Sequence, residues 1–134
     1  MKKFIFMSLV LIVFFIVSGC NNKNSVPNIK ADYFDIGFGD SLYFGHNKVD
    51  NETVQSLVKA YNQIEYSGQT NQEINYEKAI TITFIYNDQI SGTLVIDDKG
   101  LFHIKDSAEN YLIEPNTDIY QQALDIFYEV KNQS

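Results

Sequence analysis

Strict alternation over residues 79–86, AITITFIY, is the feature of this sequence that most restricts its fold. β-Branched and aromatic side chains recur there at every second position, which is typical of a strand with one face in a hydrophobic core. Residues 89–97, QISGTLVID, alternate in the same way, and Asn87-Asp88 between the two segments predicts a reversal of the chain. We therefore expect an antiparallel hairpin. The residues of its second strand expected to face the core are Ile90, Leu94 and Ile96.

The sequence on either side extends this hairpin into a larger sheet. Asp97-Asp98-Lys99-Gly100 places glycine where a tight turn needs positive φ, so LFHIK and then YLIE are expected as two further strands. Residues 33–46 alternate around GFGDS and predict a separate short hairpin.

Two segments repeat apolar residues at the three-and-four spacing of an amphipathic helix. The first follows a cap at Asp50 or Asn51 and is expected to end before Ser67-Gly68. The second follows Pro115, with Asn116 or Thr117 as its cap. The predicted apolar faces are Val54, Leu57, Val58, Tyr61 and Ile64 in the first helix, and Ile119, Tyr120, Ala123, Leu124, Phe127 and Val130 in the second.

An antiparallel sheet and two amphipathic helices each have one apolar side, and packing them face to face buries all three. The sequence therefore predicts an α+β fold, a two-layer sandwich of a β-meander and two helices in the order ββ-α-ββββ-α. Residues 31–134 are enough for one small domain and too few for two. The polar residues 20–30 are expected to form a flexible tether before it.

The single cysteine of the chain, Cys20, comes directly after an apolar run. Met1-Lys2-Lys3 forms a basic start, residues 4–17 are uncharged and apolar, and Ser18-Gly19 supplies small residues before the cysteine. This is the layout of an export signal. The run is shorter than the roughly 20 apolar residues that a membrane-spanning helix needs.

Val17-Ser18-Gly19-Cys20 resembles the lipobox of bacterial lipoproteins. The resemblance implies that a signal peptidase removes residues 1–19 and that the sulfur of Cys20 carries a diacylglyceryl group. Two acyl chains make such an anchor stable, because each buried methylene contributes about 0.8 kcal/mol. The expected location is the extracytoplasmic face of the cell membrane, with lipid as the membrane contact.

Other interpretations of Cys20 stay open. A different signal peptidase could leave a stray thiol, the apolar run could remain as an uncleaved membrane anchor, or the thiol could be reactive or bind a metal. One cysteine cannot form an intramolecular disulfide, and no second cysteine or histidine lies near it to complete a zinc site.

The charge of the chain excludes some partners. The formal net charge is −7, and the loss of Lys2 and Lys3 with the signal would make it −9. The chain has no arginine, so nucleic acid is not an expected partner. Electrostatic attachment to anionic lipid headgroups is equally unfavourable.

Two glycine-containing segments could suggest a bound ligand. Asp97-Asp98-Lys99-Gly100 offers two carboxylates, but a calcium loop spreads its oxygen ligands over about twelve residues, so a hairpin turn is favoured. Residues 37–40, GFGD, lack the third glycine, the following helix and the lysine of a phosphate loop. We predict no metal and no cofactor.

Catalysis would depend on His46 and His103, the two imidazoles of the chain, or on a pair of its many carboxylates. His103 is expected in a strand, on the face opposite Phe102 and Ile104. No nucleophile elbow precedes a helix, so we do not predict an enzyme, and a small hydrolase remains the least favoured alternative. The partners that a catalytic triad could use are Ser91, Asp106 and Ser107.

Tyrosine is abundant, and not every ring fits one small core. The rings either cover the edges of the sheet with their hydroxyls in water or form an aromatic recognition patch. The tyrosines in question are Tyr33, Tyr43, Tyr66, Tyr76, Tyr86, Tyr111 and Tyr128.

In layout, the domain resembles the small, uncharacterised lipoproteins of Gram-positive bacteria, in which a helix, a meander and a terminal helix follow a short tether. The segments that carry this resemblance are NETVQSLVKAYNQI, ITITFIYNDQISGTLVIDDKGLFHI and YLIEPNTDIYQQALDIFYEV. The leading hypothesis is a non-catalytic, lipid-anchored module that binds a protein, peptide or cell-wall partner through its sheet face or an aromatic edge. The alternative is an immunity lipoprotein that sequesters a cationic antimicrobial peptide.

Overall fold

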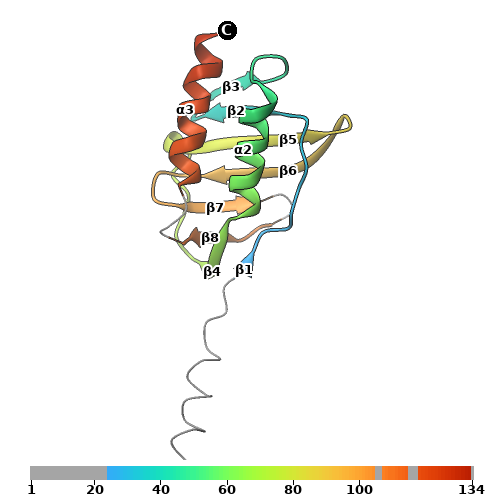
Figure 1. The fold of residues 1–134 in the computed structure, drawn as a ribbon. Coiled ribbons are helices and arrows are strands. Elements are labelled where there is room, and N and C mark those ends of the chain that lie inside the picture. The colour runs from blue at the N-terminus through green and yellow to red at the C-terminus, as the bar shows by residue number, and fades with distance from the viewer. Residues whose placement is uncertain (1–23, 105–106, 115–117, 134) are drawn as a thin grey trace, which may run out of the picture.

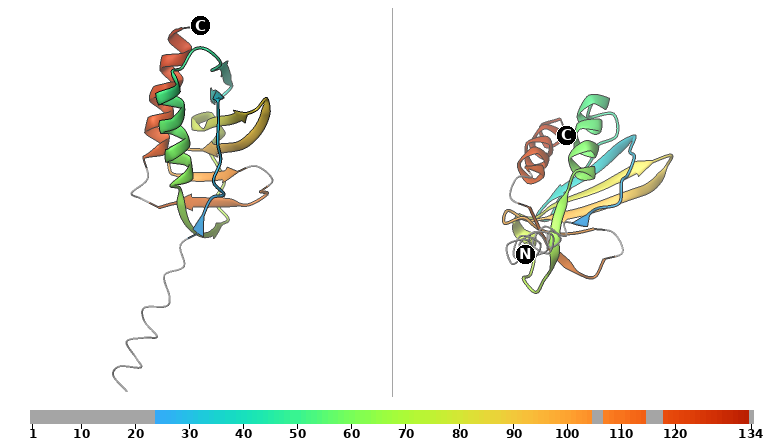
Figure 2. Two further views of the ribbon diagram at one scale, coloured as in Figure 1. Left: turned by 45° about the vertical axis from the view of Figure 1, so that its right-hand side comes forward. Right: turned by 60° about the horizontal axis from the view of Figure 1, so that its bottom comes forward.

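The computed structural model describes residues 24–104, 107–114 and 118–133, and it has the predicted α+β architecture. The eight strands of these residues form one antiparallel sheet in the order β1-β4-β8-β7-β6-β5-β2-β3, and helices α2 and α3 lie side by side across one face of it (Figures 1 and 2). The elements are β1 (Asn24–Ser25), β2 (Tyr33–Phe38), β3 (Ser41–Phe44), α2 (Asn51–Asn62), β4 (Glu65–Thr70), the 3₁₀ turn η1 (Tyr76–Lys78), β5 (Ile80–Tyr86), β6 (Gln89–Ile96), β7 (Leu101–Ile104), β8 (Asn110–Ile113) and α3 (Ile119–Asn132). The predicted signal over residues 1–19 and Cys20 lie outside the described residues.

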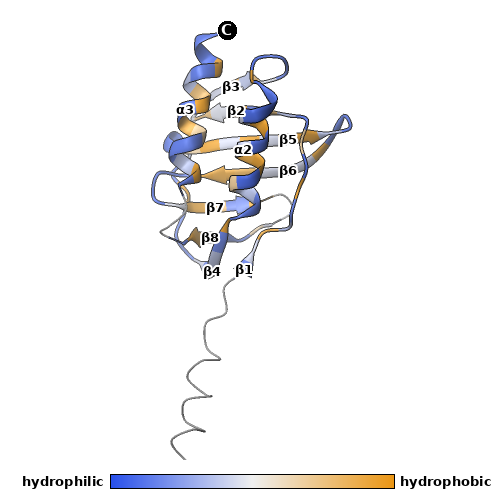
Figure 3. Ribbon diagram, in the orientation of Figure 1, coloured by the Kyte–Doolittle hydropathy of each residue, from blue (hydrophilic) through white to orange (hydrophobic). Residues whose placement is uncertain are grey.

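The main core lies between the helices and the face of the sheet that they cover, here called the inner face. Figure 3 shows the apolar stripes of both helices turned toward the sheet. Of the residues predicted on the inward side of β5, Ile80, Ile82 and Phe84 are fully buried, whereas Tyr86, at the end of the strand, is 37% exposed. The inner face contributes Phe34, Ile36, Ile80, Ile82, Phe84, Leu94, Ile96 and Phe102, and the helices contribute Val54, Leu57, Val58, Tyr61, Ile119, Ala123, Ile126, Phe127 and Val130.

Helix α2 begins as predicted. The backbone N–H of Thr53 donates to Oδ1 of Asp50 at 2.7 Å, which is the hydrogen bond of an N-cap. This bond favours the ionised carboxylate and so lowers the pKa of Asp50 below its usual value. The caps predicted for the second helix, Asn116 and Thr117, lie outside the described residues.

The prediction that Ile90 faces the core is wrong. Phe84 pairs with Gly92 and Ile85 pairs with Ile90, which leaves Ser91 as an extra residue in β6. Such a β-bulge changes the phase of the alternation. Ile90 therefore lies on the outer face with Ile85 and is 52% exposed.

The region after α2 also differs from the prediction. The helix ends at Asn62, and Ile64 is fully buried in the connection after it. Ser67-Gly68, expected to be a break between elements, lies inside strand β4. Gly68 has a φ of +72°, and the pairing with β8 shifts register between Tyr66 and Gln69. The glycine accommodates an irregularity within the strand.

The flexible tether expected over residues 20–30 does not extend through its described part. β1 pairs with β4, and Val26 is 3% exposed within the main core. The side chain of Asn62 accepts the N–H of Ile29 at 2.8 Å and donates to its carbonyl at 3.1 Å. Residues 24–30 therefore pack against the domain.

We predict that Asn62→Ala lowers the free energy of unfolding by about 1–3 kcal/mol, because both backbone groups of Ile29 lose their partner. Gln63→Ala, at an exposed neighbouring position, is the matched control. Urea unfolding measures the difference, and limited proteolysis at Lys30 is expected to be faster in Asn62→Ala alone. Equal stability and equal cleavage in the two variants would contradict this role of Asn62.

Candidate functional site: the outer face of the sheet and its free edge

The face of the sheet that the helices do not cover is here called the outer face. The segment 71–79 folds over this face at β6 and β7, in the middle of the sheet. Ile74 and Ala79 pack there on Leu101 and Val95 and form a second, smaller core. The outer face of β2, β3 and β5 lies beyond this cluster.

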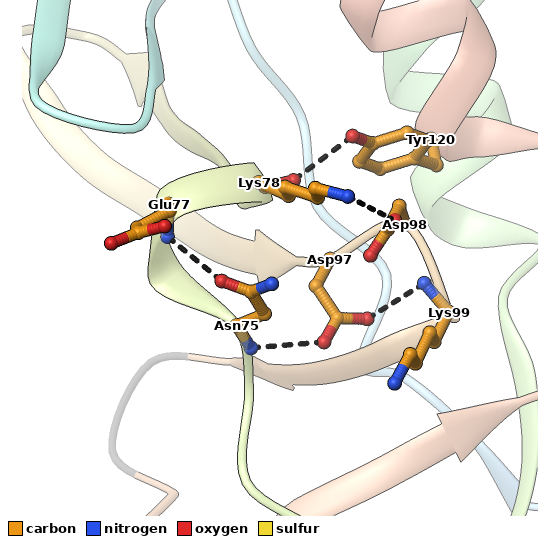
Figure 4. A network of polar contacts seen from close by, with 7 residues as sticks. All are labelled: Asn75, Glu77, Lys78, Asp97, Asp98, Lys99 and Tyr120. Atoms are coloured by element: carbon orange, nitrogen blue, oxygen red, sulfur yellow. Dashed lines mark hydrogen bonds and ion pairs between the residues drawn. The ribbon is translucent and has the colours of Figure 1, made fainter.

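The side chain of Asp97 joins the segment 71–79 to the turn between β6 and β7 by hydrogen bonds. Its fully buried carboxylate accepts the backbone N–H groups of Asn75 at 3.1 Å, Lys99 at 2.9 Å and Leu101 at 3.0 Å (Figure 4). The lone pairs that would bind a cation are thus directed at backbone donors, which agrees with the turn predicted for residues 97–100. Within the described ranges, no group of three or more acidic, His or Cys residues could hold a metal ion.

A cavity of about 420 Å³ lies beside this turn, between β8 and the start of α3. Asp98, Glu114 and Asp118 line it together with Lys99, and the described lining residues include no Ser, Thr, Cys or His. Tyr120, also in the lining, donates its hydroxyl to the carbonyl of Lys78 at 2.9 Å.

The Tyr120 phenol remains protonated near neutral pH. Burial, and then the charges of Asp98 and Asp97, raise the pKa of Tyr120 above its usual value. The described lining of the cavity thus combines carboxylates with a protonated phenol.

A second hollow, of about 330 Å³, lies between α2 and α3 and is acidic as well. Gln122 donates there to the hydroxyl of Ser56 at 3.0 Å and joins the two helices. Its lining consists of Asp50, Glu52, Thr53, Ser56, Gln122, Asp125 and Ile126.

The structure keeps the two histidines apart. His46 stacks on Tyr33, with the ring centroids 4.5 Å apart, beside β2. His103 lies on β7 opposite Val95, on the outer face as predicted. Strands β2 and β7 are three positions apart in the sheet, a separation of roughly 14 Å at the usual strand spacing.

The residues suggested as triad partners are engaged elsewhere. Ser91 donates to the carbonyl of Lys30 at 2.6 Å, and Ser107 donates to the carbonyl of Glu109 at 3.2 Å. Asp106 lies outside the described residues. The described serines suggested for a triad are therefore hydrogen-bonded to backbone carbonyls.

The tyrosines do not gather into one patch. Tyr76, Tyr86 and Tyr128 are the exposed ones, and they lie on η1, β5 and α3 respectively. The rings of Tyr43 and Tyr111 pack against Phe127 and Phe102, at centroid distances of 5.5 and 5.8 Å. Tyr43, Tyr66 and Tyr111 thus lie partly buried at the periphery of the main core.

Among the large apolar side chains that the structure describes, the most exposed is that of Phe44, on β3, a strand at an edge of the sheet. Phe44 is 66% exposed and Leu42 is 59% exposed, and both lie on the outer face. Leu42 pairs with Gly37, and its Cδ1 lies 3.6 Å from where a Cβ of residue 37 would be. The glycine thus leaves room for the leucine to lie across β2.

The backbone of β3 is directed outward at the same two residues. Phe38 pairs with Ser41 across the two-residue turn Gly39-Asp40. In an antiparallel ladder, alternate residues direct both N–H and C=O at the neighbouring strand. Ser41 and Tyr43 therefore bond to β2, whereas Leu42 and Phe44 direct their polar groups away from the sheet.

Comparison with protein-family models, with curated proteins and with solved structures found no match to this chain. None of the described helices is long and apolar enough to cross a membrane.

We predict that Asp97→Asn lowers the free energy of unfolding by about 1–3 kcal/mol, because the amide cannot accept all three backbone N–H groups. Asp98→Asn removes the same charge from the adjacent residue. This control loses only an ion pair with Lys78 at 3.8 Å and is expected to change stability by less than about 0.5 kcal/mol. Urea denaturation measures both variants, and a change of equal size in the two would show that charge alone accounts for the effect.

Proposed function

We propose that this protein is a lipoprotein anchored through Cys20 on the extracytoplasmic face of the cell membrane, and that it binds a protein, peptide or cell-wall partner without catalysis. The binding surface in this proposal is the outer face along β3, here called the β3 surface and defined by Leu42 and Phe44. Support for the anchor comes from the lipobox sequence, and support for the surface comes from the exposure of these two side chains.

The position of β3 relative to β1 is the observation that carries the proposal. β1 begins at Asn24, four residues after Cys20, and four residues span at most about 14 Å. β1 and β3 are the two edges of the eight-stranded sheet, and seven strand spacings amount to roughly 34 Å measured along the sheet. In Figure 1 they lie at its lower and upper ends. An anchor at Cys20 holds the β1 edge near the bilayer and presents the β3 surface away from it.

The charge of the mature chain favours a basic partner. A net charge of −9 attracts cationic ligands and repels nucleic acid and anionic lipid headgroups. The same property supports the alternative function, capture of a cationic antimicrobial peptide close to the membrane that it attacks. The acidic hollows between α2 and α3 and beside Tyr120 add to this attraction.

We predict that Cys20→Ser abolishes lipid attachment, because serine lacks the sulfur that accepts the diacylglyceryl group. Labelled glycerolipid is expected to enter the wild-type protein and a Ser25→Ala control, but not the Cys20→Ser variant. Mass spectrometry of the wild-type N-terminus is expected to show a modified Cys20. An unmodified thiol there would refute the anchor.

A photo-crosslinking amino acid tests the β3 surface in the full-length protein in its native cell. At position 44 it is expected to give a discrete adduct, whereas at position 128, an exposed aromatic position on α3, it is not. Phe44→Ser is expected to weaken partner binding about 10- to 100-fold, because it removes an apolar group from the interface. Identical adducts at both positions, or no adduct at either, would contradict the proposal.

A further inference from the structure

We propose that the free edge of β3 binds an extended basic peptide, which adds to the sheet as a ninth strand. This inference rests on the proposed function as a binding module and specifies both the kind of partner and how it is held. Strand addition supplies main-chain hydrogen bonds for affinity and alternate side-chain contacts for specificity.

Strand β3 forms an open edge of the sheet. An edge strand presents a row of unpaired N–H and C=O groups, and proteins usually blunt it with lysine, proline or a bulge. β3 is Ser-Leu-Tyr-Phe, with no charge and no proline, and its pairing with β2 is regular over all four residues. The opposite edge of the sheet, β1, is only two residues long. β3 is thus the edge with the better template for another strand.

Apolar side chains on the outer face lie beside this edge. Leu42 and Phe44 lie two residues apart on the outer face, so apolar residues at alternate positions of an added strand would pack against them. On the inner face, Tyr43 packs against Phe127 of α3 at 5.5 Å. The strand is therefore fixed by the core on one side and free to contact a ligand on the other.

The negative charge of this chain favours a basic peptide over a second copy of the chain as the partner of β3. Asp40 is exposed immediately before β3. A basic strand would place a cationic side chain near this carboxylate, whereas Asp35, opposite Phe44, already accepts the N–H of Gly45 at 3.2 Å. Two copies joined edge to edge would instead bring together two chains of charge −9, which repel each other.

The experiment uses the full lipidated protein in nanodiscs of neutral lipid. The probe is an acetylated and amidated octapeptide of alternating lysine and valine. Its control is the same peptide with every amide N-methylated, which keeps the side chains and the charge but removes the donors. We expect methylation to weaken binding about tenfold or more, because at least two backbone hydrogen bonds are lost.

Hydrogen exchange locates the bound strand. The amides of Leu42 and Phe44 are expected to gain protection when the unmethylated peptide binds. The amides of Ser41 and Tyr43, which already bond to β2, serve as internal controls and are expected to change little. Leu42→Lys is expected to reduce binding, whereas Ile90→Lys, at an exposed outer-face position on β6, is not.

Three results would overturn the inference. Equal binding of the methylated peptide would show that side chains and charge alone hold it. Protection of Leu42 and Phe44 that depends on protein concentration without peptide would identify a second copy as the occupant. Absence of peptide binding together with a position-44 adduct in cells would refute strand addition and leave the proposed binding function standing, whereas absence of both would refute the two together.

Discussion

The packing of aromatic rings around Phe84 is the interaction on which the rest of this structure depends. Phe84 is fully buried in β5, an interior strand of the sheet, and packs edge to face with Phe34 and Tyr61 at centroid distances of 6.3 and 5.2 Å. These contacts join β2, β5 and α2 in a chain whose one cysteine cannot form an internal disulfide. Helices α2 and α3 both lie on that face of the sheet.

The parts of the fold that follow from local sequence could be predicted, and those that depend on distant pairing could not. The alternation of β5 and the cap at Asp50 are set by neighbouring residues. β1 has only two residues and exists because β4, about 40 residues later, pairs with it. The bulge at Ser91 likewise arises from the register between two strands, so the alternation in β6 gave no sign that Ile90 faces outward.

The same distinction applies to the candidate site. Asp97 was recognisable as a turn residue because two of the groups it accepts, from Lys99 and Leu101, are local, although the third comes from Asn75. Leu42 and Phe44 could not be recognised as a surface, since apolar residues after a turn are typical of a buried hairpin. Their exposure follows from the strand order, which puts β3 at an edge and which no short segment specifies.

The two edges of the sheet differ in how far their residues are bonded and buried. At the β1 edge, the bonds between Asn62 and Ile29 and the burial of Val26 hold the chain that leads back to Cys20. At the β3 edge, two large apolar side chains remain more than half exposed, so they add little to the stability of the fold. Exposed apolar groups beside unpaired backbone groups favour association. The proposed anchor at the first edge and the proposed partner at the second would together account for both.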